Sequence, residues 1–278
     1  MKPSLRLVVF SDIDGVLLEP RGSAFAEAAK ALKRLGGEVP PLVLCSSRTR
    51  AEIEAIQQQL GISHPFVCES GAAAFVPAGY FGFDVPNARD LAGYQAVEFG
   101  WPYAEVVQTL HRTAERLRIE IVGFSAMSME EVARDCHLPL LQAQLAKLRE
   151  YSERFRILDP TETTRHHLFR ALKAAGLRCV TGEQYDHVGA PVDTSIGVNV
   201  LCSLYQRAYG GVLTVGLADP MADDKLLQLV NRRVIVCDDD PTKGGVDVVG
   251  WAEGIVDIVE ELSRKESSRF PTMREDHR

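Results

Sequence analysis

The chain has 278 residues, of which 46% are hydrophobic and 25% are charged, and its formal net charge at neutral pH is −7. This composition is ordinary for a folded globular protein and excludes a largely disordered chain. No block of lysine and arginine stands out, so the sequence lacks the electrostatic footprint of a protein that binds nucleic acid or an anionic membrane surface. A small anionic substrate is compatible with the sequence, provided that positive charge gathers locally.

The cysteines show no C-x-x-C pair and no spacing typical of a zinc site or a disulfide framework, so we expect buried free thiols. The N-terminal residues Met1-Lys2-Pro3 lead almost directly into the first strand, and no apolar run reaches membrane-spanning length. We therefore expect a reduced, cytoplasmic protein. The six cysteines are Cys45, Cys68, Cys136, Cys179, Cys202 and Cys237.

The first predicted strand ends in two acidic residues. An apolar run from Leu7 to Phe10 leads into Asp12 and Asp14, and Gly15 follows at once. This pattern predicts a buried strand that delivers two carboxylates into a tight turn. In an open α/β sheet, ligands bind beyond the carboxyl ends of the parallel strands, so these acids would lie at the floor of a site. The alternative is a strand followed by a simple Asx-type turn.

Helices and strands then alternate as far as about residue 71. The pattern predicts a helix over 25–35, a strand over 42–45, a helix over 50–60 and a strand over 66–68. Strands and helices that alternate at these lengths indicate βαβ units and a parallel sheet.

The rhythm changes from about Phe83, and we interpret the segment that follows as an inserted α+β module. Polar loops are predicted over 84–93, and the first architecture resumes after about residue 190. Inside the module, the predicted helices cover 104–117, 128–135, 140–151 and 162–175, and the predicted strands 119–124, 155–158, 177–181 and 185–188. After it come helices over 195–208, 225–230 and 252–262, strands over 212–219 and 233–237, and a polar tail over 263–278.

Three predicted strand ends carry chemically useful side chains. The first presents Asp12 and Asp14, a later one Ser46 with Arg48 nearby, and a third Asp219, which is followed by Asp223. Clustered carboxylates suit Mg²⁺, which takes one or two of them together with substrate phosphate oxygens. In phosphate transfer, one carboxylate can act as nucleophile while a neighbouring acid protonates the leaving oxygen and then activates water. A hydroxyl and a cation would hold the phosphoryl oxygens.

These motifs, taken in order, resemble those of the haloacid dehalogenase superfamily of phosphatases. Further segments resemble the mannosyl-3-phosphoglycerate phosphatase family in particular, and the likeness extends from about residue 5 to 262. The segments that carry it are Asp12-Ile13-Asp14-Gly15, Leu44 to Glu54, Glu69-Ser70-Gly71, Lys147 to Glu153, Gly216 to Asp223, and Gly250-Trp251. The resemblance implies a Rossmann-like α/β core over 1–83 and 190–262 and an inserted α+β cap over 84–189 that selects the substrate.

The resemblance also implies roles for individual residues. Asp12 would be the nucleophile and a metal ligand, and Asp14 the general acid/base that also contributes its backbone carbonyl to the metal. Ser46 would bind the phosphoryl group, Asp219 would ligate Mg²⁺, and Asp223 would support the metal site.

The implied reaction is hydrolysis of mannosyl-3-phosphoglycerate to mannosylglycerate and phosphate. The glycerate end would meet the segment from Arg149 to Ser152, for which a solvated helix end is the alternative. The remaining residues expected at the phosphate or the substrate are Ser47, Arg48, Tyr151, His187 and Thr194. Nothing in the sequence indicates an oligomeric state.

The chain departs from the family at several positions. Thr194 stands where the family has a lysine that steadies the phosphate, and losing one preorganised donor in comparable sites costs about 10²- to 10³-fold in turnover. Ala218, Ala222 and Ser70 also replace a glycine and two asparagines. Either Arg48 or Lys225 supplies the missing charge, or catalysis has decayed and the chain only binds a phosphorylated ligand or a partner.

Two further alternatives stay open at this point. One is a phosphatase for a different sugar phosphate, because the cap side chains that choose the sugar are not known from sequence. The other is a receiver-like or nucleotide-binding α/β module. Proteins of that class have no large inserted cap. They carry a lysine after a strand or a G-x-G-x-x-G loop, and this sequence has no such glycine loop after a strand.

Overall fold

The computed structural model describes residues 6–17, 40–218 and 224–235. The chain divides into two compact units, one formed by Met1–Pro41 with Gly211–Arg278 and the other by Leu42–Gly210. The predicted division into a core and a cap at residues 84 and 189 stays a prediction. The predicted features outside the described residues are the helix over 25–35, Asp219, Ala222, Asp223, Cys237, the helix over 252–262 and the tail over 263–278.

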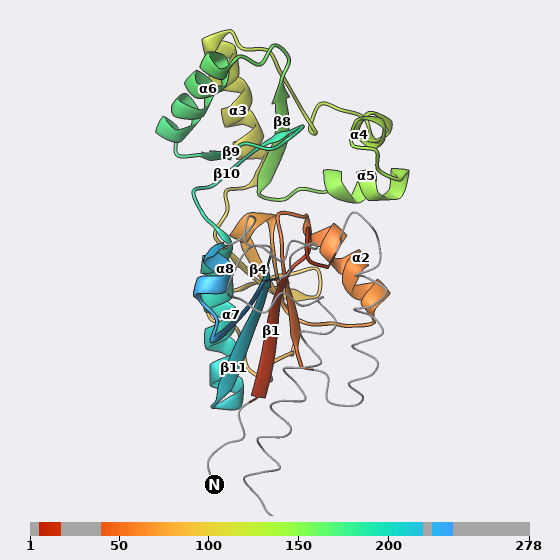
Figure 1. Cartoon of the computed structure of the whole chain (residues 1–278), viewed down its shortest axis with the longest axis vertical. Helices are drawn as coiled ribbons and strands as arrows, with labels where there is room; N and C mark the ends of the chain where they lie inside the picture. The colour runs from red at the N-terminus through yellow and green to blue at the C-terminus, as the bar shows by residue number, and fades with distance from the viewer. Residues whose placement is uncertain (1–5, 18–39, 219–223, 236–278) are drawn as a thin grey trace, which may run out of the picture. The chain divides into compact units, whose positions relative to one another are not determined.

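The first unit contains three parallel strands in the order β12-β11-β1. They are β1 (Arg6–Asp12), β11 (Val212–Ala218) and β12 (Arg232–Ile235), and β1 and β11 run side by side in Figure 1. Helix α8 (Asp224–Gln228) follows β11. It packs so closely on β11 that a Cβ at Gly216 would lie 2.9 Å from Leu226 Cδ2. The predicted parallel strands of this unit are confirmed.

The second unit contains a mixed five-strand segment in the order β2-β3-β4-β6-β5, in which β2 and β3 are parallel and the other pairs antiparallel. Helices α2 and α7 lie on opposite sides of β4 (Figure 1). Helix α2 begins with the capping box of Thr49 and Glu52. The bounds are β2 (Leu42–Cys45), α2 (Arg50–Leu60), β3 (Phe66–Cys68), β4 (Ala73–Pro77), β5 (Arg89–Leu91), β6 (Tyr94–Glu98) and α7 (Thr194–Tyr209).

The prediction of polar loops over 84–93 is wrong in part, because β5 and β6 form a hairpin there. Leu91 pairs with Tyr94, and the two residues between them, Ala92 and Gly93, both have positive φ values of 52° and 86°. Two-residue hairpin turns of this kind are usually marked by Asn-Gly or Asp-Gly. An Ala-Gly pair lacks that signal, which explains why the hairpin was missed.

A four-stranded antiparallel sheet in the order β7-β8-β10-β9 belongs to the same unit. Its main core lies between α3, α6 and β8 and includes Leu110, Phe155 and Leu168, while α4 and α5 enclose a separate small core around Val132. Figure 1 shows these two helix pairs apart from each other. The bounds are α3 (Tyr103–Leu117), β7 (Ile121–Gly123), α4 (Met129–Asp135), α5 (Leu140–Lys147), β8 (Ser152–Ile157), α6 (Glu162–Ala174), β9 (Arg178–Val180) and β10 (Asp186–Gly189).

The predicted fold class is confirmed by these two kinds of sheet. Parallel strands separated by helices form the α/β part, and an antiparallel sheet with its own helices is inserted between β6 and α7. A receiver-like module has no such insertion, so that alternative does not describe this chain.

The predicted helix over 140–151 is too long, because α5 ends at Lys147. Continuing the helix would require the backbone N–H groups of Glu150 and Tyr151 to donate to carbonyls one turn earlier. They donate instead to the side-chain carboxylate of Glu69, at 2.8 and 3.3 Å. A carboxylate from another part of the chain therefore unwinds the end of this helix.

The prediction of buried thiols is confirmed for Cys45 and Cys68, whereas the thiols of Cys136, Cys179 and Cys202 are only half-buried. Within the described residues, no helix combines the length and the apolar character needed to span a membrane.

Candidate active site

Asp12 and Asp14 lie at the carboxyl end of β1, on either side of the fully buried Ile13. Asp12 is half-buried and its Oδ1 accepts a hydrogen bond of 2.7 Å from the backbone N–H of Ile13, whereas Asp14 is exposed. The chain turns at Gly15, where φ is 76°. This turn lets β1 present two carboxylates at its end, one held against the backbone and one reaching solvent.

The carboxylates of β1 are hard oxygen donors of the kind that Mg²⁺ prefers. The parallel register pairs Ser11 with Leu217, so the end of β11 that precedes Asp219 in the chain lies beside the end of β1 that carries Asp12. No group of three or more potential metal ligands occurs among the described residues, and two of the four predicted ligands, Asp219 and Asp223, fall outside them. The described half of the predicted metal site, Asp12 and Asp14, therefore offers oxygen donors of the type that suits a divalent cation.

Ser46 lies just after β2 and is almost fully buried. Its hydroxyl oxygen accepts a hydrogen bond of 3.2 Å from the backbone N–H of Arg48, so its own O–H proton can point toward a ligand. The loop is fixed from the next strand, because Ser46 N–H donates to Val67 O and Ser70 N–H donates to Ser46 O, at 3.0 and 2.9 Å. The sequence thus places a rigid hydroxyl at the end of a buried strand.

The turn η1 (Glu69–Gly71), which follows β3, packs directly against the start of α7. A Cβ at Gly71 would lie 2.1 Å from the carbonyl oxygen of Asp193 and 2.6 Å from the backbone nitrogen of Thr194. Asp193 caps α7 by accepting from the N–H of Ser195 at 3.0 Å. The structure therefore brings the Ser46 loop and the buried Thr194 against the same turn.

The segment with Arg149, Tyr151 and Ser152 is buried, so the alternative of a solvated helix end is wrong. Arg149 donates to Ser47 O at 3.2 Å and to Ser152 O at 2.8 Å, and it pairs with Glu69 at 3.4 Å. The hydroxyl of Tyr151 donates to Glu98 at 2.7 Å. Burial and this hydrogen bond raise the pKa of Tyr151, so it stays a neutral donor.

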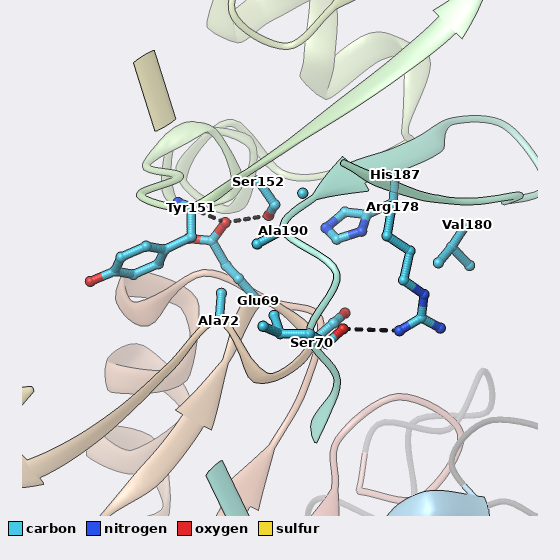
Figure 2. Close-up of a pocket in the computed structure, with 11 residues that line it drawn as sticks. Glu69, Ser70, Ala72, Tyr151, Ser152, Arg178, Val180, His187 and Ala190 are labelled. Carbon is cyan, nitrogen blue, oxygen red and sulfur yellow. Dashed lines mark hydrogen bonds between the residues drawn. The ribbon is translucent and has the colours of Figure 1, made fainter. Parts of the chain in front are cut away.

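A pocket lies between η1, the start of β8 and the β9–β10 hairpin, and Figure 2 shows its lining. Ser70, Ala72, Tyr151, Ser152, Arg178 and His187 are among the lining residues. In the figure the hydroxyl of Tyr151 points away from the pocket, while the imidazole ring of His187 and the side chain of Arg178 face it. Polar side chains from η1, β8, β9 and β10 therefore border one cavity, among them Ser70, Ser152, Arg178 and His187.

His187 is held neutral in this pocket. Burial lowers the pKa of its imidazole well below the ordinary value, and the nearby guanidinium groups of Arg149, Arg154 and Arg178 lower it further. Arg154 also donates to Ser47 Oγ at 3.3 Å. The positive charge that a small anionic substrate needs is therefore present locally, in a chain that is negative overall.

The two predicted replacements for the missing lysine have different surroundings. Arg48 forms an ion pair of 3.0 Å with Glu52, which offsets its charge. Lys225 is exposed on α8, which belongs to the other compact unit. The structure thus gives Arg48 a competing carboxylate and supplies no argument for Lys225.

Sequence reasoning gave no role to three residues that shape this region, namely Glu69, Arg154 and Arg178. Glu69 follows the buried strand β3 at once, which is the same signal that singled out Asp12 after β1. Arg154 and Arg178 carry no such signal, because exposed or half-exposed arginines on short strands are common. Their place near His187 follows from the register of β10, whose His187 pairs with Arg154 on one side and Val180 on the other.

Comparisons with known proteins identify the family to which the chain is similar. A family model described as haloacid dehalogenase-like hydrolase matches residues 9–79. Two relatives named glucosyl-3-phosphoglycerate/mannosyl-3-phosphoglycerate phosphatase, from Methanococcoides burtonii and Persephonella marina, are 30% and 31% identical to the chain. The alignments cover 92% and 93% of this chain and 98% and 99% of the relatives.

Among solved structures, a sugar phosphatase of haloacid dehalogenase subclass IIB superposes with a TM-score of 0.55 at 12% identity. The superposition covers 91% of this chain and 99% of that one. At this identity the likeness supports the fold alone.

Proposed function

We propose that this chain, which belongs to the mannosyl-3-phosphoglycerate phosphatase family of the haloacid dehalogenase superfamily, is a Mg²⁺-dependent phosphatase that hydrolyses mannosyl-3-phosphoglycerate or its glucosyl counterpart. Phosphatase activity follows from the family itself. The observation that carries the choice of substrate is the likeness over more than nine-tenths of the chain to two relatives named for both compounds. A cytoplasmic location and a small phosphorylated substrate, without nucleic acid or membrane partners, are part of the same proposal.

Asp12 is the nucleophile in this proposal, and its place at the end of β1 supports that role. A carboxylate oxygen of Asp12 attacks phosphorus, the bond from phosphorus to the glycerate oxygen breaks, and an aspartyl-phosphate forms. The exposed Asp14 gives its proton to the leaving oxygen. It then takes a proton from water, which attacks phosphorus and releases Asp12 and inorganic phosphate.

The remaining residues of the proposal bind and orient the substrate. The Ser46 hydroxyl donates to a phosphoryl oxygen, and Thr194, in the first turn of α7 and against the same turn as the Ser46 loop, meets the phosphate beside it. Asp12, Asp14, Asp219 and Asp223 would hold Mg²⁺, which neutralises charge on the phosphoryl oxygens when bound. The cap, which includes His187, closes over the leaving group and selects it.

A phosphate-release assay tests the substrate and the metal together. We expect the purified protein to release phosphate from mannosyl-3-phosphoglycerate or glucosyl-3-phosphoglycerate with Mg²⁺, and to lose that activity when the metal is chelated. Full activity with chelator would contradict the metal dependence. Turnover of other sugar phosphates but of neither phosphoglycerate would contradict the substrate.

The Thr194→Lys variant tests what the departure at this position costs. Thr194 is buried in the first turn of α7, and a lysine there would restore a positive donor near the phosphate. Because one preorganised donor is worth about 10²- to 10³-fold in comparable sites, we expect turnover to rise by about 10-fold or more. Thr194→Met, which adds length without charge, should show no gain. An unchanged or lower rate for Thr194→Lys would mean that another group already supplies this charge.

A further inference from the structure

The carboxylate of Glu69 is enclosed by donors from one short segment. It accepts from the backbone N–H groups of Glu150 and Tyr151 at 2.8 and 3.3 Å, and from the hydroxyl of Ser152. Arg149 completes the set with an ion pair of 3.4 Å. Figure 2 shows Glu69 reaching from η1 to Ser152. Four consecutive residues, from Arg149 after α5 to Ser152 at the start of β8, therefore contact a single side chain of another element.

Arg149 extends this contact to a third segment. Its guanidinium donates to Ser47 O at 3.2 Å, in the loop that follows β2, and to the carbonyl and hydroxyl oxygens of Ser152 at 2.8 and 2.7 Å, and it lies 3.4 Å from His187 Nε2. The side chains of Arg149 and Glu69 are 1% and 0% exposed. One buried ion pair thus joins the Ser46–Ser47 loop, η1 and the start of β8.

Glu69 and Arg149 contact other residues of the chain, and burying their two charges costs desolvation free energy. This cost points to a role other than stability. A buried ion pair is often no more stabilising than apolar residues of the same volume, because both charges lose their hydration. The backbone here is also strained, since Glu69 and Ser70 both have left-handed φ values of 45° and 58°. Strain of this kind persists where the surrounding structure holds it and is common at functional sites.

We propose that the Glu69–Arg149 ion pair is a positioning device that fixes the loop bearing Ser46 relative to the pocket wall of Tyr151 and Ser152. This inference rests on the proposed function, in which Ser46 meets the phosphoryl group and the pocket meets the rest of the substrate. The pair sets the separation between these two ends. A substrate that occupies both ends depends on this separation, whereas a small aryl phosphate depends on the phosphate end alone.

The test compares two substrates in three variants and one control. The variants are Glu69→Gln, Arg149→Met and the double variant. The control is Arg50→Gln, which removes a half-exposed ion pair of 3.0 Å between Arg50 at the start of α2 and Glu150, so it cuts a different link to the segment that carries Arg149. The substrates are mannosyl-3-phosphoglycerate and p-nitrophenyl phosphate, and the unfolding midpoint is measured for each protein.

We expect each single variant to lower kcat/KM for the sugar phosphoglycerate by about 10²-fold, mainly through kcat, because small misplacements of reacting groups cost about that much. For Glu69→Gln the rate on p-nitrophenyl phosphate should change by less than about 3-fold. Both rates of the Arg50→Gln control should also change by less than about 3-fold, since ion pairs near the surface contribute little. The double variant leaves no unpaired buried charge, so its unfolding midpoint should return toward that of the parent protein while its discrimination between the substrates stays lost.

Three outcomes would overturn the proposal. The first is that the double variant regains both its unfolding midpoint and its preference for the sugar phosphoglycerate. The second is that the single variants lose activity equally on both substrates, and the third is that Arg50→Gln loses as much activity as they do. Hydrogen exchange separates this failure from failure of the proposed function. The amides of Glu150 and Tyr151 should be protected from exchange in the parent protein and in the control, and they should exchange faster in the single variants. This expectation does not depend on which sugar phosphate is the substrate. Unchanged exchange rates would refute the positioning role directly.

Discussion

Replacing Asp12 by asparagine should abolish phosphate release on every substrate, with a loss of about 10⁴-fold or more. The amide is a poor nucleophile and a weaker metal ligand than the carboxylate, and removing the nucleophile of a comparable hydrolase costs about 10⁶-fold. The measurement is kcat for phosphate release from p-nitrophenyl phosphate and from the sugar phosphoglycerate. An unchanged far-UV circular dichroism spectrum would show that the variant is folded.

Asp14→Asn is the matched control, because Asp14 follows Asp12 in the same turn and has a different proposed role. p-Nitrophenolate leaves without needing a proton, whereas release of phosphate from Asp12 needs a base. We therefore expect Asp14→Asn to release about one equivalent of p-nitrophenol in a burst and then to turn over slowly, and Asp12→Asn to show no burst. A burst from Asp12→Asn, or undiminished turnover, would contradict the nucleophile assignment.

Gly71→Ala should destabilise the protein by about 2–5 kcal/mol. Gly71 has a φ of 94°, and an added Cβ would lie 2.1 Å from the carbonyl oxygen of Asp193. The methyl group therefore adds overpacking of about 1–3 kcal/mol to a backbone penalty of about 1–2 kcal/mol, and it pushes η1 away from α7. Denaturant unfolding measures the loss, and activity should fall as well because Thr194 begins α7.

Gly61→Ala separates the two parts of this effect. Gly61 also has a positive φ, of 70°, but nothing lies within 4 Å of the position of its Cβ. Its loss should be about 1–2 kcal/mol, the backbone penalty alone. Equal losses at the two positions would show that the approach of η1 to α7 contributes nothing.

Patterns of local sequence predicted most of the fold. Buried runs such as Leu42–Cys45 and a capped amphipathic segment such as Arg50–Leu60 carry their own signals, and both elements form where they were expected. The hairpin of β5 and β6 was missed because Ala92-Gly93 is an unusual turn sequence. The end of α5 was misplaced because Glu69, more than 70 residues earlier in the chain, takes the N–H groups that a helix would have used.

In the candidate site, too, some residues carry a local sequence signal and others do not. An acid after an apolar strand is visible in sequence, so Asp12 and Asp14 could be named as candidates, and the same reasoning applied to Glu69 would have found it. The sequence does not reveal which residue each charged side chain contacts in the fold. Arg149 was expected to meet the substrate, and its contacts with Glu69 and Ser47 follow from pairings across the chain that no local pattern encodes.

The two separate cores of the antiparallel sheet and its helices bear on how this protein could change its specificity over time. The core between α3, α6 and β8 includes Leu110 and Phe155, whereas a smaller cluster around Val132 joins α4 and α5 to Phe124 and Tyr185 beside the sheet. Close packing transmits strain within a core, but substitutions in one cluster need not disturb the other. Drift or design can therefore alter α4 and α5 with little effect on the larger core, as long as the contacts of the smaller cluster with Phe124 and Tyr185 are kept.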